Sequence, residues 1–292
     1  MVNTTSYCHL TVDLEDYKHA TMLDMGLPPR TNPEQAWRGL TRIFSALQST
    51  SGDPHVTLFT TGQVARDQPD LVGEMVRCGH EIACHGDQHE DLFTLDRKDF
   101  FRSLQRAKAA LEEASGQTVL GFRAPNFSLD DRSPWAFNTL SEMGFAYDSS
   151  LVTDRPRTGH EQYDCLPLAE RRLFEFPLYR RRVGPRHGIR VIGGTYFRLL
   201  PLPVILHLMD EAVGKGFVPL VYLHAADADD RPSPVRWREM QGLPTLSKSR
   251  WVIHQRQWTW GTRAVAEKLQ AVLERFPNLG PLRKALPQSV TA

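Results

Sequence analysis

Short apolar runs alternate with longer amphipathic stretches along the first half of the chain. The short runs, bounded by glycine, proline and polar residues, are typical of buried strands. The amphipathic stretches repeat their apolar residues at helical spacing, as Trp37, Leu40 and Phe44 do, and predict helices. Strands are predicted at residues 9–12, 56–59, 81–84, 119–122 and 145–147, and helices at residues 33–49, 71–78, 98–114 and 135–143.

Strands that alternate with helices predict an α/β fold with a mostly parallel sheet. In such folds the functional residues gather where the strands end, at the carboxyl edge of the sheet. Several polar clusters of this chain directly follow predicted strands. The pattern therefore predicts one shared site at that edge.

The second half of the chain is less regular. It contains two predicted strands around an arginine-rich turn, a loop that opens at Gly193 and Gly194, a helix, and a strand that ends at His224. A long loop rich in Asp, Pro, Ser and Arg precedes the last helix, and the end of the chain is expected to fray. The strands fall at residues 175–178, 189–192 and 219–223, the helices at 203–213 and 262–275, the loop at 227–249, and the fraying residues after 286.

The composition is typical of a globular protein, with 292 residues, 41% of them hydrophobic and 24% charged. We interpret residues 1–292 as a single catalytic domain, with a core at about 7–225 and a C-terminal loop and helix at 226–286. A net charge of +1 gives no indication of a nucleic-acid partner.

The cysteines, the length of the apolar runs and the N-terminal residues indicate the cellular compartment. The 4 cysteines form no CxxC pair and are expected to be free thiols. No run approaches the ~18 apolar residues of a membrane span, and the N-terminus lacks the features of a signal peptide. We therefore expect no membrane span and a cytoplasmic location.

Two histidines four residues apart, His85 and His89, follow the strand predicted at residues 81–84. On a helical turn such a pair shares a face, so both imidazoles could bind one metal ion; the alternative is a pair of surface histidines at a helix start. An acidic cluster of Asp13, Glu15 and Asp16 follows the first predicted strand. It could supply a carboxylate ligand and a base that activates water, or it could cap the next segment.

Arg123 and Asn126 follow the strand predicted at residues 119–122. An arginine beside a catalytic carboxylate keeps it ionised and oriented through a bidentate hydrogen bond. The backbone N–H of Asn126, after the Pro125 kink, could stabilise a developing oxyanion. His224 ends a nearly unbroken apolar strand and could act as a general acid toward a leaving amine. Taken alone, each of these residues also fits a structural role.

The order of these motifs resembles the polysaccharide deacetylase family, also called the NodB-homology or carbohydrate esterase 4 family. The resemblance runs from about His9 to His224. It rests on the acidic strand end, on Gly-His-Glu-Ile-Ala-Cys-His-Gly-Asp-Gln-His at residues 79–89, on Arg-Ala-Pro-Asn-Phe-Ser at residues 123–128 and on the final Leu-His. The blocks at residues 11–17 and 193–201 are similar to the subfamily associated with bacterial exopolysaccharide and surface-glycan systems.

This resemblance implies a distorted (β/α) barrel, often of seven strands, and metal-dependent hydrolysis of an N-acetyl group from an amino sugar. The roles that it implies are base for Asp13, orienting residue for Arg123, oxyanion donor for the Asn126 N–H, general acid for His224, and metal ligands for His85 and His89.

The chain departs from the family pattern at two places. Two adjacent aspartates usually follow the first strand, but Leu14 occupies the second position here. The ligand role is therefore carried over to Glu15, with Asp16 as the rival. A Pro-Trp-Glu run often follows the last histidine, whereas this chain has Ala-Ala-Asp at residues 225–227.

We therefore expect an N-deacetylase that acts on an acetamido sugar in a glycan, a glycolipid precursor or a sugar-containing small molecule. Two imidazoles and one carboxylate favour Zn²⁺ as the divalent metal. Two alternatives stay open: a hydrolase of the same fold that acts on another amide, such as a cyclic imide or ureide, and a non-catalytic sugar-binding protein.

Overall fold

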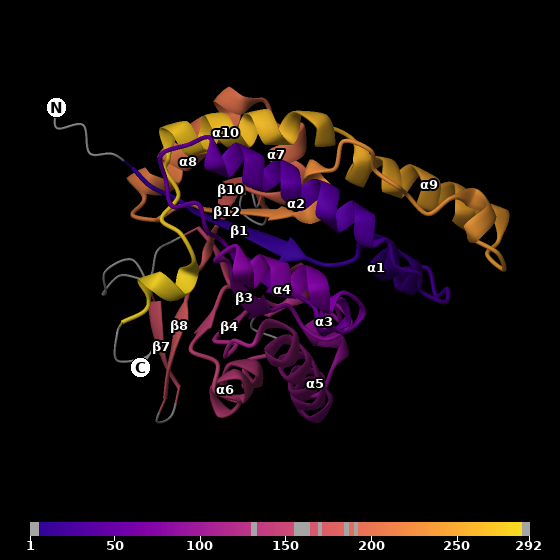
Figure 1. Ribbon diagram of the computed structural model, residues 1–292, viewed down its shortest axis with the longest axis horizontal. Helices are drawn as coiled ribbons and strands as arrows, with labels where there is room; N and C mark the ends of the chain where they lie inside the picture. Colours follow the sequence, from indigo (N-terminus) through magenta and orange to yellow (C-terminus); the bar gives the residue numbers. More distant parts are fainter. Residues whose placement is uncertain are drawn as a thin grey trace.

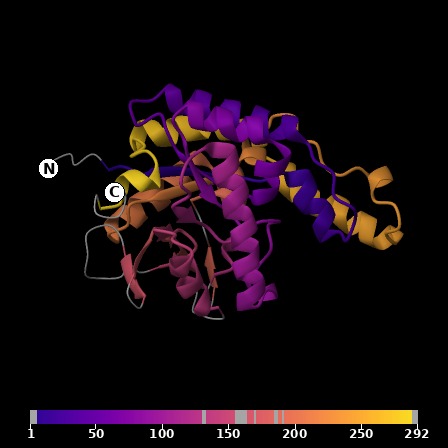
Figure 2. The same cartoon turned by 60° about the horizontal axis from the view of Figure 1, so that its bottom comes forward.

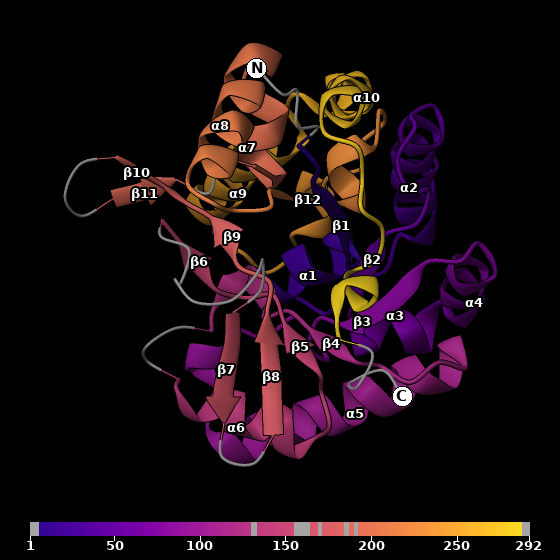
Figure 3. The ribbon, with the colours of Figure 1, turned by 90° about the vertical axis from the view of Figure 1, so that its left-hand side faces the viewer.

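A curled, mostly parallel sheet forms the centre of the molecule. The computed structural model describes residues 6–129, 133–154, 164–168, 171–183, 187–189 and 192–287. The sheet has eight strands in the order β12-β1-β2-β3-β4-β5-β8-β7 (Figure 1). The strands from β12 to β8 run parallel to their neighbours, and β7 is antiparallel to β8. Figure 3 shows how the sheet curls from β12 round to β7, which confirms the expected distorted (β/α) barrel of seven parallel strands.

The strands of this sheet are β1 (His9–Leu14), β2 (Thr57–Thr60), β3 (Glu81–Cys84), β4 (Gly121–Phe122), β5 (Tyr147–Asp148), β7 (Asp164–Leu168), β8 (Arg171–Glu175) and β12 (Leu220–His224). Two separate pairs are β6 (Val152–Thr153) with β9 (Leu178–Tyr179), and β10 (Arg181–Val183) with β11 (His187–Ile189). The α-helices are α1 (Tyr17–Asp24), α2 (Pro33–Gln48), α3 (Gly62–Asp67), α4 (Pro69–Arg77), α5 (Arg97–Ser115), α6 (Trp135–Glu142), α7 (Gly194–Leu199), α8 (Leu202–Gly214), α9 (Thr245–Thr259) and α10 (Val265–Arg275).

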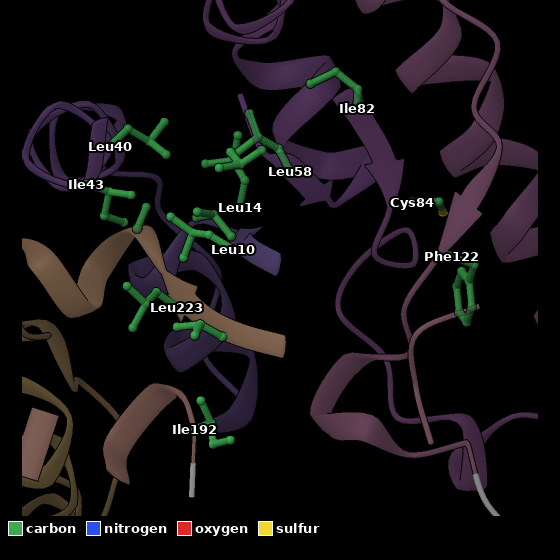
Figure 4. Packing of buried hydrophobic residues seen from close by; sticks show 14 of the residues in the cluster. Leu10, Leu14, Leu40, Ile43, Leu58, Ile82, Cys84, Phe122, Ile192 and Leu223 are labelled. Carbon is green, nitrogen blue, oxygen red and sulfur yellow. The ribbon is translucent and has the colours of Figure 1, made fainter. Parts of the chain in front are cut away.

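Alternate residues of β1 serve different faces of the sheet, because successive side chains of a strand point in opposite directions. Leu10 and Leu14 belong to the main hydrophobic cluster together with Leu40 and Ile43 of α2 (Figure 4). Burying a leucine side chain of this kind contributes about 1.5–3 kcal/mol to folding. The intervening residues, Asp13 among them, face the other side, where the sheet carries its polar groups.

The strand register sets the position of the site. Asp13 of β1 pairs directly with His224 of β12 and with Phe59 of β2. The residues that follow β3 and β4 leave the sheet at the same carboxyl edge, since all these strands are parallel. The register therefore brings together segments that are more than a hundred residues apart in the chain.

Helices α1 and α9 extend together beyond the end of the sheet (Figures 1 and 2). They share a small hydrophobic cluster of their own, which includes Met22, Met25, Val235 and Met240. Helix α9 differs from the expected loop at residues 227–249, because it begins within that range at Thr245. Its apolar residues do not form one buried stripe, so the sequence pattern does not reveal the helix.

Several other local predictions differ from the structure. Gly194 begins helix α7, where a loop was expected. Helices α1 and α3 were not expected either; both are short, and each is capped by a side chain of the residue that precedes it, Asp16 or Thr61. The strand predicted at 175–178 is divided between β8, which ends at Glu175, and β9, which begins at Leu178. Of the strand predicted at 189–192, residue 189 is the last of β11, and residues 190–191 lie outside the described part of the chain. Most of the predicted fraying segment, from residue 288 on, lies outside the described residues.

Among the described residues, no helix combines the length and the hydrophobicity that a membrane crossing requires. Cys8 and Cys84 are free thiols buried in the core, and Cys78 is a free thiol on the surface. Burial raises the pKa of both buried thiols to about 12, which makes them unreactive at neutral pH. The side chain of Cys165 lies outside the described part of the chain.

Candidate active site

The acidic cluster after β1 divides into two parts. Asp13 and Glu15 are two residues apart and face the same side, whereas Leu14 between them is fully buried in the core. Asp16 is the N-cap of α1: its Oδ1 accepts from the backbone N–H of His19 at 2.9 Å, and its Oδ2 from that of Asn32 at 2.6 Å. Both oxygens of Asp16 are engaged in this way, so its position is that of a capping residue.

His85 and His89 lie on a loop, and not on the helical turn that the four-residue spacing suggested. The loop begins where β3 ends, and the backbone N–H of His85 donates to the carbonyl of Thr60 at 2.9 Å. His89 adopts a left-handed backbone conformation with φ = 62°, which few non-glycine residues adopt. The Asp87 carboxylate between the two histidines lies 2.7 Å from Arg66 of α3 and 2.9 Å from Arg106 of α5. Two ion pairs and a strained turn therefore bring the imidazoles together.

Glu15, His85 and His89 form a group that fits a metal ion. One potential ligand atom from each lies within 4.8 Å of the others. Glu15 Oε2 is buried, lies 2.8 Å from His89 Nε2, and has no hydrogen-bond partner among the described residues. A carboxylate oxygen and an imidazole lone pair this close require a proton or a cation between them. The donor set therefore fits a divalent metal, and the three expected ligands lie together in the protein.

The protonation states in this group follow from burial and charge. Burial lowers the pKa of His85 to about 4, so its ring is neutral at neutral pH. Its Nδ1 donates to the Arg123 carbonyl at 2.9 Å, which leaves Nε2 as the available ligand atom. Burial by itself raises the pKa of Glu15, but His89 and the other nearby imidazoles hold that pKa well below its usual range. Glu15 is therefore ionised, as a metal ligand must be.

Asp13 is held by Arg123 in the interior of the sheet. Arg123 is fully buried, and its Nη1 donates to Asp13 Oδ1 at 2.7 Å and to Thr11 Oγ1 at 3.0 Å. Its Nη2 and Nε donate to the side chain and carbonyl of Ser149, and the guanidinium lies 3.9 Å from the Phe59 ring centre. The prediction of a bidentate hydrogen bond is therefore wrong. One donor group of Arg123 orients Asp13, and the other two bind Ser149.

His224 faces both acidic residues. Its Nε2 lies 4.0 Å from Asp13 Oδ2 and 3.9 Å from Glu15 Oε1. Its Nδ1 donates to Asp227 Oδ2 at 2.8 Å, and Arg198 Nε donates to the other oxygen of Asp227 at 2.6 Å. Burial lowers the pKa of His224, but the carboxylates of Asp227, Glu15 and Asp13 together raise it to about 9.

Asp227 and Arg198 were missed as site residues. The sequence contained a signal for each, because Asp227 follows His224 by three residues and Arg198 lies in the quoted block at residues 193–201. Arg198 is buried, and its remaining donors bond Thr195 Oγ1 and the carbonyls of Gln257 and Trp260. Arg198 therefore connects Asp227, the partner of His224, with the C-terminal end of α9.

Asn126 lies in a 3-10 turn, η2 (Pro125–Phe127), directly after the Arg123 segment. Asn126 and Phe127 have φ values of 53° and 54°, and both line the pocket described below. The Asn126 side chain donates to Asp91 Oδ1 at 2.9 Å. In the described part of the chain, the non-glycine residues with positive φ are these two and His89. Such strain persists where the surrounding structure enforces it, and it concentrates at functional sites.

All of these groups open onto one pocket with a volume of about 310 Å³. Asp13, Glu15, His85, His89, Asn126 and His224 line it, and Arg123 lies behind Asp13. Five aromatic side chains also line it: Tyr17, Phe127, Tyr196, Tyr222 and Trp258. The structure thus brings seven of the eight candidate residues to one place and assigns Asp16 to the cap of α1.

Two family models each match a part of the chain. Residues 37–147 match the family model for polysaccharide deacetylases, and residues 153–278 match a model described as a domain of unknown function. A peptidoglycan deacetylase-like protein of Gibberella zeae is 32% identical over 113 residues, covering 39% of this chain and 32% of the relative. A chitooligosaccharide deacetylase of Sinorhizobium fredii is 39% identical over 70 residues, covering 24% of this chain and 33% of the relative. The chain thus spans about a third of the length of these relatives.

Solved structures agree in fold. One from Mycobacterium smegmatis, described as a candidate polysaccharide deacetylase, aligns with a TM-score of 0.54 and 21% identity over 95% of this chain and 94% of the other. A carbohydrate esterase 4 family pseudoenzyme from Bacillus anthracis aligns with a TM-score of 0.50 and 13% identity over 99% of this chain and 67% of the other. The family match includes His85, His89 and Arg123, and the fold match extends over the whole sheet. Residues 37–147 of the chain are thus similar to the polysaccharide deacetylase family.

Proposed function

We propose that the protein is a metal-dependent hydrolase that removes the N-acetyl group from an acetamido sugar of a glycan. The observation that carries this proposal is the placement of three units in one pocket: the Glu15–His85–His89 group, Asp13 held by Arg123, and His224 held by Asp227. Hydrolysis of an amide requires an activated carbonyl, a base for water and an acid for the leaving amine. The deacetylases among the relatives support a sugar substrate.

Glu15, His85 and His89 would hold the metal, and two imidazoles with one carboxylate favour Zn²⁺. A bound metal of this kind polarises a carbonyl oxygen and lowers the pKa of water. The chain contributes a neutral His85 ring fixed by the Arg123 carbonyl and an ionised Glu15. The potential ligand atoms of the three residues already lie within 4.8 Å of one another.

Asp13 is the proposed base. Arg123 engages Oδ1, so Oδ2 is the oxygen on the side of the pocket, 4.0 Å from His224 Nε2. A carboxylate held from one side keeps its second oxygen in a constant position, where it can accept a proton from the attacking water. The backbone N–H of Asn126 is the proposed donor to the oxyanion, on the ground that its turn lines the pocket.

His224 is the proposed acid. With a pKa of about 9 it is protonated at neutral pH, and Nδ1 is committed to Asp227. Nε2 therefore carries the proton that is available to the leaving amine. Asp227 also fixes the orientation of the His224 ring, and Asp227 is itself held by a hydrogen bond from Arg198 Nε.

Replacing Asp227 with asparagine is expected to move the alkaline limb of the pH profile of kcat/KM downward by about one unit or more. The proton on His224 is stabilised by the Asp227 charge, so activity that needs this proton is retained up to a higher pH in the wild type than in the variant. Asparagine can still accept from Nδ1, so the ring keeps its orientation. An unchanged alkaline limb would show that Asp227 does not support the acid. Glu239→Gln, which removes a carboxylate outside the pocket, is the control.

Glu15→Ala is expected to abolish stoichiometric Zn²⁺ binding, whereas Asp16→Ala should leave it intact. Glu15 belongs to the histidine group, but Asp16 caps α1, and loss of such a cap costs about 1 kcal/mol of stability. Metal content after dialysis and the urea midpoint separate the two effects. Metal loss in the Asp16 variant with retention in the Glu15 variant would reverse the assignment.

The function itself is tested by acetate release from a panel of acetamido sugars and their oligomers, with and without a chelator. Acetate release that stops on chelation and returns with Zn²⁺ is the expected result. A panel of cyclic imides and ureides is assayed beside it. Turnover of these compounds without acetate release from any sugar would refute the proposal in favour of another amide hydrolase.

A further inference from the structure

The outer face of helix α9 exposes large apolar side chains to solvent. Among the described residues, the three most exposed of the large hydrophobic side chains are Leu246 at 65%, Ile253 at 62% and Trp260 at 76%. Leu246 and Ile253 belong to α9, and Trp260 is its C-cap residue. Single apolar residues scattered over a surface need no explanation, but a group of them on one element marks a contact surface.

The spacing of these three residues places them on one side of the helix. Each follows the one before by seven residues, or about two helical turns, so the side chains form a row about 20 Å long, which we call the α9 outer row. Gln255 is buried on the other side of the helix, where Trp251 and Val252 pack against the cluster shared with α1. Figures 1 and 2 show α9 at the edge of the molecule with α1 beside it, so the α9 outer row faces outward.

Two arginines alternate with the apolar residues along the α9 outer row. Arg250 lies four residues after Leu246 and three before Ile253. Arg256 lies three residues after Ile253 and four before Trp260. Residues at these separations are neighbours on a helix surface, and both arginines are exposed. The same face of the helix therefore presents apolar side chains and positive charges side by side.

The segment around the α9 outer row carries positive charge only. Residues 240–266 contain no Asp or Glu, and their cations are Lys248, Arg250, Arg256 and Arg263. The whole chain has a net charge of +1, so this charge is a local concentration. A symmetric contact between two copies of α9 would bring the same cations together, which is unfavourable. The charge therefore favours an anionic partner over a second copy of the chain.

Apolar residues and arginines on one helix face are typical of helices that lie in the interface of an anionic lipid membrane. Leucine, isoleucine and tryptophan side chains enter the boundary between headgroups and acyl chains, while arginine keeps its guanidinium at the lipid phosphates. A nucleic acid would match the charge but would leave Leu246 and Ile253 without an apolar partner. We propose that the α9 outer row docks the protein onto a membrane surface that contains anionic lipids.

Docking through this face brings the candidate active site close to the lipid surface. Trp258, on the inner side of α9, lines the pocket, and Arg198 donates to the Trp260 carbonyl at 2.7 Å. The α9 outer row thus ends beside the pocket. The inference goes beyond the proposed function and does not depend on it, because it concerns the surface at which the protein acts and not the reaction.

Sedimentation of the whole chain with lipid vesicles tests the proposal. Vesicles of phosphatidylcholine alone are compared with vesicles that contain about 30% phosphatidylglycerol. The wild type is expected to bind the mixed vesicles about tenfold more tightly or better. The double variant Arg250→Glu with Arg256→Glu should weaken this binding about tenfold or more, and Trp260→Ala should weaken it about fivefold.

Arg102→Glu on α5 and Trp37→Ala on α2 are the matched controls. Arg102 is exposed, Trp37 is 39% exposed, and neither residue belongs to the cluster that α9 shares with α1. Both variants should bind the mixed vesicles within about twofold of the wild type. If Trp260→Ala does not fold, Ile253→Ser takes its place, since Ile253 is also exposed and the same loss of binding is expected.

A second readout locates the contact. Brominated phosphatidylcholine in the mixed vesicles should quench the tryptophan fluorescence of the wild type more than that of Trp260→Ala. Equal quenching would show that another face meets the lipid and would overturn the inference. So would equal affinity for both kinds of vesicle, or equal weakening by the test and control variants. A dimer that Ile253→Ser dissociates, without vesicle binding by the wild type, would instead assign the α9 outer row to a contact between copies of the chain.

Discussion

Replacing Asp13 with asparagine is expected to lower kcat for acetate release by about 10²- to 10⁴-fold, the usual contribution of a general base. Asparagine has the same shape but cannot take a proton from water. Bound Zn²⁺ should remain at the wild-type level, because Asp13 does not belong to the Glu15–His85–His89 group. Acetate release and metal content, measured on the same preparation, test both parts.

Thr11→Val is the matched control for this substitution. Thr11 also accepts a hydrogen bond from Arg123 Nη1, so its loss disturbs the same buried guanidinium without removing a base. We expect the Thr11 variant to keep most of the activity while losing some stability. Near-wild-type turnover in the Asp13 variant, or an equal loss in both variants, would rule out Asp13 as the base.

Arg123→Met is expected to lower the free energy of unfolding by about 3–5 kcal/mol, which is the cost of leaving one member of a buried ion pair without its partner. Arg123 is fully buried and Asp13 is 1% exposed, so water cannot replace the lost charge. The substitution also removes the donors that hold Thr11 and Ser149. Urea unfolding, followed by fluorescence, measures the loss.

The same variant should lose more turnover than metal content, because Arg123 orients the base while its contact with His85 is made by the backbone carbonyl. A double-mutant cycle sharpens the test. Combining Arg123→Met with Asp13→Asn should recover part of the lost stability, since the buried pair is then neutral on both sides. Strictly additive losses would show that the two side chains do not depend on each other. Arg123→Lys keeps the charge and should fall between the wild type and the methionine variant.

The segment at residues 153–278, which matches a domain of unknown function, contributes several residues to the pocket. That segment contains His224, Asp227 and Arg198, and it contains the α9 residue Trp258. The segment that matches the deacetylase model contains His85, His89 and Arg123. The acidic residues Asp13 and Glu15 precede both. The candidate site is complete only when β1 and β12 lie side by side.

Much of the fold and of the site could be predicted from local patterns. Apolar runs and helical spacing identified β1 to β5, α2, α5, α8 and α10, because each of these elements buries one continuous face or stripe. The positions of Asp13, His85, Arg123 and His224 at strand ends indicated one shared edge. Parallel strands end on the same side of a sheet, so the order of elements along the chain was sufficient for that inference.

Tertiary structure decided the remaining points, since each depends on contacts between distant segments. Glu15 is the proposed ligand in place of Asp16, because the backbone N–H of Asn32 engages Asp16 whereas His89 faces Glu15. The approach of His85 and His89 came from a loop fixed by ion pairs of Asp87, and no helical spacing encodes it. Helix α9 lacks a buried apolar stripe, so the sequence pattern does not predict it. Its packing depends on the small hydrophobic cluster that it shares with α1. Local sequence determines which residues can lie at the edge of the sheet, but the long-range contacts determine which of their atoms stay available for chemistry.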